Sequence, residues 1–171
     1  MATDIVRTRP ESDIGPWVKH GIFGGVVAGL VFAIFEMVIA AVQMGGDAFF
    51  MPLRMIGGIA LGPQAMDPGT SLLTSGGAGL VVHIVLSAIY GAGVAAVAWA
   101  VPGLRSSTAS LVIWGSLAGL ALWIGNFYVI APIAGWRWFP DMTDPVVQFV
   151  AHTFVYGSLL GLYLDRTARA R

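Results

Sequence analysis

Four polar side chains interrupt the apolar stretches of this sequence, and their types could support metal, haem or proton chemistry. Glu36 stands inside the apolar run GLVFAIFEMVIAAV at 29–42. His83, Asn126 and His152 stand inside three later apolar runs. Placing a charge at the centre of a bilayer costs roughly 2.5–3.5 kcal/mol on insertion scales. Polar residues kept at such a cost are candidates for a functional site.

Imidazole and carboxylate groups are common ligands of iron, zinc and copper, so His83, His152 and Glu36 form a candidate transition-metal site. The two histidines, on facing helices, could instead be axial ligands of a haem b. A small polar ligand is a further candidate. In each case Asn126 would orient the bound group through hydrogen bonds. No HxxxH or ExxH pair occurs that would bring two ligands together on one helix.

Two other interpretations of these residues stay open. The polar side chains could hydrogen-bond to one another and to the backbone, and so fix how the helices pack. The protein would then be a structural or accessory subunit of a larger membrane complex. Alternatively, a Glu/His/His set could relay protons, which would make the protein a proton or ion conduction component. No catalytic residue is identified, because neither a nucleophile elbow nor a phosphate-binding loop is present.

Composition indicates that these polar residues lie in a lipid bilayer. Of the 171 residues, 57% are hydrophobic and only 11% are charged, whereas soluble domains have about 25% charged residues. Glycine is abundant at 23 residues, as is common in membrane helices. The net charge is zero, so no nucleic-acid partner is expected. The absence of cysteine excludes disulfides and thiolate metal sites.

Four apolar segments are each long enough to cross a bilayer, which takes roughly 20 residues. We therefore predict an all-α integral membrane four-helix bundle. The apolar stretch 51–62 in the first loop is too short to span and begins near Pro52, so we predict an interfacial or re-entrant helix there. The predicted spans are about 17–44, 74–101, 109–132 and 146–164, in a single transmembrane domain (17–164) between a polar tail (1–16) and a basic tail (165–171).

The distribution of lysine and arginine predicts the orientation of the spans. The two tails, the start of the first span and the middle loop together hold seven of these residues, and the other two loops hold two. By the positive-inside rule, both termini lie in the cytoplasm and the protein is a multi-pass protein of the cell (inner) membrane. Its expected partners are the lipid bilayer and either other membrane subunits or further copies of the chain.

Small residues predict which face of each span turns toward its neighbours, because membrane helices pack through close contacts of small side chains. Each of the four polar residues shares a helix face with small or polar residues of its own span. These faces are Gly21–Gly25–Gly29 leading to Glu36, Gly79–His83–Ser87–Gly91, Gly115–Gly119 leading to Asn126, and Gln148–His152–Tyr156.

The depth of the four residues in their spans separately indicates that they lie together. At 1.5 Å per residue, their distances from the predicted outer ends of the spans place them within about 5 Å of one height. We therefore predict that Glu36, His83, Asn126 and His152 converge in the outer half of the bilayer, away from the lipid.

Two stretches of the first 100 residues carry a resemblance. MPLRMIGGIALG at 51–62, followed by VVHIVLSAIYG at 81–91, resembles bacterial four-span membrane proteins that have no assigned activity. The resemblance implies four helices with an additional helix in the first outer loop. It implies no chemistry and carries over no functional residue.

Overall fold

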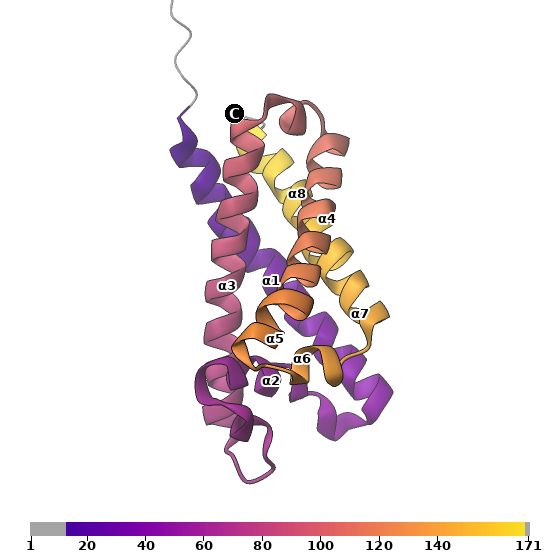
Figure 1. Ribbon diagram of the computed structural model, residues 1–171. Coiled ribbons are helices and arrows are strands. Elements are labelled where there is room, and N and C mark those ends of the chain that lie inside the picture. Colours follow the sequence, from indigo (N-terminus) through magenta and orange to yellow (C-terminus); the bar gives the residue numbers. More distant parts are fainter. Residues whose placement is uncertain (1–12, 170–171) are drawn as a thin grey trace, which may run out of the picture.

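The structure is a computed structural model that describes residues 13–169. The described chain is helical and contains no β-strand. Four of its helices are long and apolar enough to cross a membrane, so the predicted all-α membrane bundle is confirmed. Figure 1 shows the first two spans as α1 (Ile14–Met44) and α3 (Leu72–Ala100). The third span is α4 (Thr108–Gly125), which continues through a π-helical turn (Asn126–Ile130) into α5 (Ala131–Ala134). The last span begins with α7 (Pro145–Val150), continues through a π-helical segment (Ala151–Ser158) into α8 (Leu159–Leu164), and ends in a π-helical turn (Asp165–Arg169).

Short helices occupy the loops between the spans. In the first loop α2 (Met51–Leu61) follows a 3-10 turn (Gly46–Ala48) and precedes another (Pro63–Met66), so the predicted short helix is present. A third 3-10 turn (Pro102–Arg105) joins α3 to α4. The stretch 135–145, between the third and fourth predicted spans, contains the one-turn helix α6 (Trp138–Asp141). The indole Nε1 of Trp138 donates to the carbonyl oxygen of Met55 (3.0 Å), which fastens α6 to α2.

Local sequence explains where several helices begin and end. The Asp144 carboxylate accepts hydrogen bonds from the backbone N–H groups of Val146 (2.8 Å) and Val147 (3.3 Å), so it caps the helix that Pro145 opens. Gly45 ends α1 with a φ of 94°, a backbone conformation that favours glycine. The chain can therefore turn sharply from α1 toward α2.

Glycines bring helix backbones into contact at three crossings. A methyl group added to any of the six glycines involved would overlap a backbone carbonyl oxygen of the opposite helix. Only glycine permits so close an approach, and membrane helices gain packing energy from it. The small-residue faces expected from the sequence thus lie at helix contacts. The crossings pair Gly25 of α1 with Gly91 of α3, Gly57 of α2 with Gly79 of α3, and Gly115 of α4 with Gly157 of the last span.

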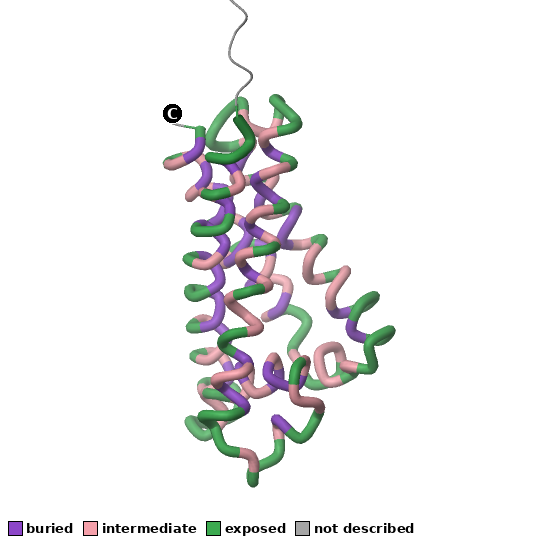
Figure 2. Tube along the Cα trace, turned by 90° about the vertical axis from the view of Figure 1, so that its left-hand side faces the viewer, coloured by how far each residue is buried: buried purple, intermediate pink, exposed green. Residues whose placement is uncertain are grey.

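The bundle consists of two helix pairs. α1 packs along α3 and α4 packs along the last span, while α1 also contacts the last span and α3 meets α4 only slightly. We call the end that holds residues 13 and 169 the terminal end, and the opposite end, which carries α2, α5 and α6, the α2–α6 end (Figure 1). Figure 2 shows that the helices spread apart toward the α2–α6 end, where short segments lie between them.

Large apolar side chains cover the outward faces of the helices. On α1, for example, Val31, Ile34, Val38 and Val42 are 42–76% exposed and recur every three or four residues. Such a stripe would be unfavourable in water but suits the hydrocarbon of a bilayer. The protein is therefore a multi-pass membrane protein whose polar residues had to be accommodated inside the bundle.

Arg54 of α2 anchors the loop that leads to α3. Its Nη1 donates to the carbonyl oxygens of Ala65 (3.2 Å), Asp67 (3.4 Å) and Thr70 (3.0 Å). One half-buried guanidinium thereby satisfies three loop carbonyls at once. This side chain holds the loop against α2. Within the loop, the Thr70 hydroxyl donates to the carbonyl oxygen of Gln64 (2.6 Å).

Replacing Arg54 by methionine, which keeps an unbranched apolar stem but removes every donor, is expected to loosen residues 62–70. Hydrogen bonds to charged groups contribute about 1.5–3 kcal/mol, and even the lower figure corresponds to a roughly tenfold change in a local opening equilibrium. Hydrogen exchange of the 62–70 peptide should therefore accelerate about tenfold. Arg137→Met is the control, because the exposed Arg137 side chain bonds to none of the described residues. Equal exchange in both variants would contradict the anchoring role.

The structure describes only part of each predicted tail. Residues 1–12 of the predicted polar tail, and residues 170 and 171 of the predicted basic tail, lie outside the described part of the chain. The first described residue, Asp13, caps α1 by accepting a hydrogen bond from the N–H of Gly15 (2.9 Å). Helix α1 thus begins three residues before the predicted span start of 17, and the last helix extends five residues beyond 164.

Candidate functional site

A cavity of about 560 Å³ lies between the spread helices at the α2–α6 end. Its walls come from α1, α2, α3, the π-helical turn after α4, α6 and α7, so every span contributes. On α1 the wall extends from Phe32 to Met44, which is about 18 Å along a helix. All four predicted site residues, Glu36, His83, Asn126 and His152, line it.

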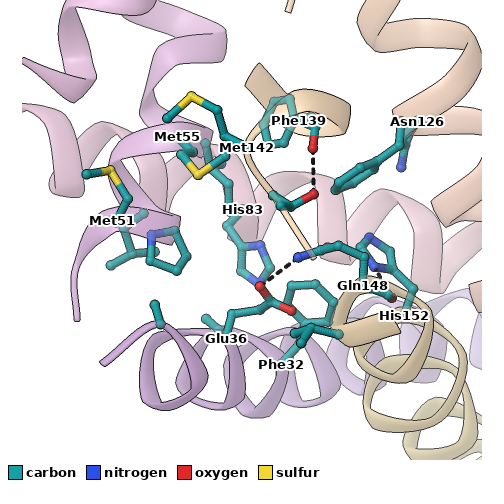
Figure 3. A pocket seen from close by; sticks show the side chains of 18 of the residues that line it. Phe32, Glu36, Met51, Met55, His83, Asn126, Phe139, Met142, Gln148 and His152 are labelled. Atoms are coloured by element: carbon teal, nitrogen blue, oxygen red, sulfur yellow. Dashed lines mark hydrogen bonds between the residues drawn. The ribbon is translucent and has the colours of Figure 1, made fainter. Parts of the chain in front are cut away.

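The Glu36 carboxyl group is the most deeply placed charged group in the cavity wall. The side chain is 8% exposed, and its Oε2 accepts a hydrogen bond from Nε2 of Gln148 (2.8 Å). Figure 3 shows the two side chains pointing toward each other from α1 and α7. Oε1 is buried and has no hydrogen-bond partner among the described residues. Since a buried polar atom normally has a partner, this oxygen is the unexplained feature of the site.

Each imidazole is held by a backbone carbonyl. Nε2 of His83 lies 2.7 Å from the carbonyl oxygen of Gly29, and Nδ1 of His152 lies 3.0 Å from that of Gln148. A carbonyl only accepts, so both of these ring nitrogens carry a proton. Phe32 contacts both rings, stacked on His83 at 5.5 Å between centroids and edge-on to His152 at 4.8 Å. The two histidines therefore pack on the same phenyl ring, and each bonds to a carbonyl and not to the other histidine.

Tyrosines connect the two helix pairs at the inner part of the cavity. The Tyr90 hydroxyl donates to Oδ1 of Asn126 (3.0 Å), which joins α3 to the helix that continues α4. The Tyr156 hydroxyl donates to the carbonyl oxygen of Ser87 (2.7 Å), which joins the last span to α3. The Asn126 side chain thus bonds to a tyrosine. No hydrogen bond among the described residues joins it to Glu36 or to either histidine.

The cavity ends where the bundle closes. Toward the terminal end, Leu111, Leu160 and Leu164 are completely buried, and Ala95 fills the space beside the α1–α3 crossing. At the α2–α6 end, the lining residues that are also exposed lie at the end of α1, at Ile130 before α5, and just before α7. They include Gln43, Met44, Met142 and Asp144. The mouth of the cavity is therefore at the α2–α6 end, and the inner end is blind.

The geometry gives the metal and haem hypotheses no support. Within residues 13–169, no three His, Cys, Asp or Glu side chains lie close enough together to hold a metal ion. The predicted set of His83, His152 and Glu36 lines one cavity, but each imidazole donates its proton to a carbonyl and both rings pack on Phe32. All four predicted residues line this one cavity, and ligation of a metal or haem iron by His83, His152 and Glu36 stays a prediction.

Two of the predicted site residues lie in π-helical segments, a wider winding that often occurs at functional sites. Asn126 opens the turn Asn126–Ile130, and His152 lies in Ala151–Ser158. The wider winding changes which side chains face the bundle interior, so a count at 3.6 residues per turn cannot place them reliably. No pattern in the sequence indicated these segments.

Several residues of the site were not among the predicted ones. Gln148 is the partner of Glu36, and Tyr90 and Tyr156 contribute hydroxyl groups to the cavity wall. Gln148 and Tyr156 share the polar stripe of His152 at four-residue spacing, so the signal for them was present in the sequence. Apolar side chains make up most of the wall, and Met51 and Met55 face the cavity across from Glu36 (Figure 3).

No family model, no curated protein and no solved structure matches this chain.

Proposed function

We propose that the protein binds a small amphipathic molecule in the cavity at the α2–α6 end. A volume of about 560 Å³ falls within the range of about 300–1,000 Å³ that is usual for small-molecule sites. Mostly apolar walls with a few polar groups are also characteristic of such sites. The observation that carries the proposal is the buried Oε1 of Glu36, a hydrogen-bond acceptor with no partner among residues 13–169.

The proposal accounts for the polar residues better than the two alternatives. If they served only to fix helix packing, a cavity of this size would be a cost, because empty space forfeits packing energy. A proton or ion path would have to continue beyond the blind inner end, where side chains are fully buried. The role of accessory subunit is compatible with ligand binding, since the apolar outer faces could meet either lipid or a partner helix.

The excess of lysine and arginine supports placing both termini in the cytoplasm, with the cavity mouth on the opposite side of the cell membrane. In this orientation the ligand would enter from the outer surface or from the outer leaflet. An amphipathic ligand concentrates at that interface, which suits a mouth at the level of the membrane surface.

Photolabelling tests the proposal at the level of single residues. The probe is trifluoromethyl-diazirinyl benzyl alcohol, a neutral amphipathic molecule, applied to the protein in nanodiscs. We expect labelling of Met55, which lines the cavity and is only 6% exposed, so that lipid-dissolved probe does not reach it. Tandem mass spectrometry would locate the label.

A cavity-filling variant provides the comparison. Ala40→Trp places a large ring in the cavity wall and is expected to reduce labelling of Met55 at least fivefold. Val38→Trp is the matched control, because Val38 lies on the same helix, is 46% exposed and does not line the cavity. Absence of Met55 labelling in the unmodified protein, or equal labelling in the two variants, would overturn the proposal.

A further inference from the structure

Charge in the cavity wall is distributed unevenly. The wall contains two carboxyl groups, Glu36 deep inside and Asp144 at the mouth, and no lysine or arginine. The one salt bridge among the described residues joins Arg169 to Asp165 at the terminal end, far along the chain from this site. Neither acid in the cavity therefore has a cationic partner within residues 13–169. A buried carboxylate without a counter-charge is costly, and either a proton or a bound cation would remove that cost.

The other polar groups in the wall do not supply positive charge either. Each histidine directs one N–H to a backbone carbonyl, so a neutral ring has only an acceptor nitrogen left. The Tyr90 and Tyr156 hydroxyl protons are given to Asn126 and to the carbonyl of Ser87. Gln148 donates to Glu36 through a neutral amide. Glu36 Oε1 remains as an acceptor to which none of the described residues donates.

Aromatic side chains line the same cavity as this acceptor. Ring faces carry negative electrostatic potential and attract organic cations, an interaction that grows stronger where water is excluded. Phe32 lies beside Glu36 in the cavity (Figure 3). The further aromatic side chains in the wall are Tyr90, Phe127, Trp136, Phe139 and Tyr156.

From this arrangement we infer that the ligand is a lipophilic organic cation, an amine or quaternary ammonium compound with an apolar body. The cationic group meets the Glu36 carboxylate and the aromatic rings, and the apolar body fills the remainder toward the methionines of α2. The acidic Asp144 at the mouth favours the approach of a cation. This inference rests on the proposed function and specifies the chemical class of the ligand.

The inference is tested with two probes of the same shape that differ in charge. Benzyltrimethylammonium carries a quaternary nitrogen, and neopentylbenzene has a carbon atom in its place. Each is titrated against photolabelling of Met55 by the neutral diazirine probe, and each competitor's concentration is expressed as its concentration in the nanodisc membrane. The cation is expected to halve labelling at a concentration at least tenfold lower than its carbon isostere.

Glu36→Gln removes the charge while keeping the shape and an oxygen for the amide of Gln148. In this variant the preference for the cation is expected to fall to less than twofold. Labelling of Met55 by the neutral probe should persist, which confirms that the cavity remains. A variant that did not fold would lose this labelling, and Glu36→Asp, which retains the charge, would then be used and should keep the preference.

The outcomes separate the two proposals. If both competitors act equally in the unmodified protein, or if Glu36→Gln keeps the preference, the cation inference is wrong and small-molecule binding stands. If the diazirine probe does not label Met55 in the unmodified protein, the proposed function itself fails.

Discussion

Replacing Gly91 by alanine is expected to lower the free energy of unfolding by about 3 kcal/mol. A Cβ at this position would overlap the carbonyl oxygen of Gly21 and lie 2.7 Å from the Cα of Gly25. Backbone atoms of α1 occupy the space, so α1 must move away from α3 and no side-chain rotation can relieve the overlap. Overpacking a core costs about 1–3 kcal/mol, and a backbone clash places this variant at the upper end. A titration with a denaturing detergent would measure the effect.

Gly93→Ala on the same helix is the matched control. An added Cβ at Gly93 meets nothing within 4 Å. Alanine is favoured over glycine in a helix by about 0.8–1.0 kcal/mol, so this variant should be as stable as the original protein or slightly more stable. Similar unfolding free energies for Gly91→Ala and Gly93→Ala would show that the α1–α3 crossing is not so close.

Replacing Gln148 by leucine is expected to lower the free energy of unfolding by about 2 kcal/mol. The change leaves both oxygens of Glu36 without a hydrogen-bond partner in the described part of the chain. Hydrogen bonds between membrane helices average only about 0.6 kcal/mol, but a buried polar group left unsatisfied costs about 1–3 kcal/mol. The second effect dominates here, because Gln148 and Glu36 are only 4% and 8% exposed.

The double variant Glu36→Leu/Gln148→Leu distinguishes this cause from a packing defect. It removes both partners, so no unsatisfied group remains and stability should recover by at least 1 kcal/mol relative to Gln148→Leu. Val146→Leu should leave stability unchanged, because Val146 lies on the outer face of α7 and is 68% exposed. Additive losses in the double variant would contradict the account of the Glu36–Gln148 pair.

Much of the fold could be predicted because the bilayer restricts the alternatives. In hydrocarbon, every backbone polar group must be paired within the protein, and a helix achieves this within one segment, so long apolar runs become helices. The glycine spacing of Gly21 and Gly25 then identified the contact face of α1, since only small residues allow the observed approach to Gly91. The short helix α6 was missed because GWRWFPDMTDP contains no span-length apolar pattern.

The candidate site was predictable in its location but not in its contacts. Counting residues from the span ends placed Glu36 and His83 at one height, and both line the same cavity. The pairing of side chains depends on their rotamers and on the π-helical winding around His152. The spacing of residues in the sequence indicates neither. The sequence therefore could not show that Glu36 pairs with Gln148, or that each imidazole bonds to a carbonyl.

The hydrogen bonds of the site have a consequence for how the protein is made. The glycine crossings join helices within residues 14–100 or within residues 108–169, so each half of the chain can associate as it leaves the translocon. The side-chain bonds from Gln148, Tyr156 and Trp138 all reach back to partners in the first half. During synthesis Glu36 therefore enters the membrane before Gln148 exists. The cavity is completed only at the end of biogenesis, when the second half docks.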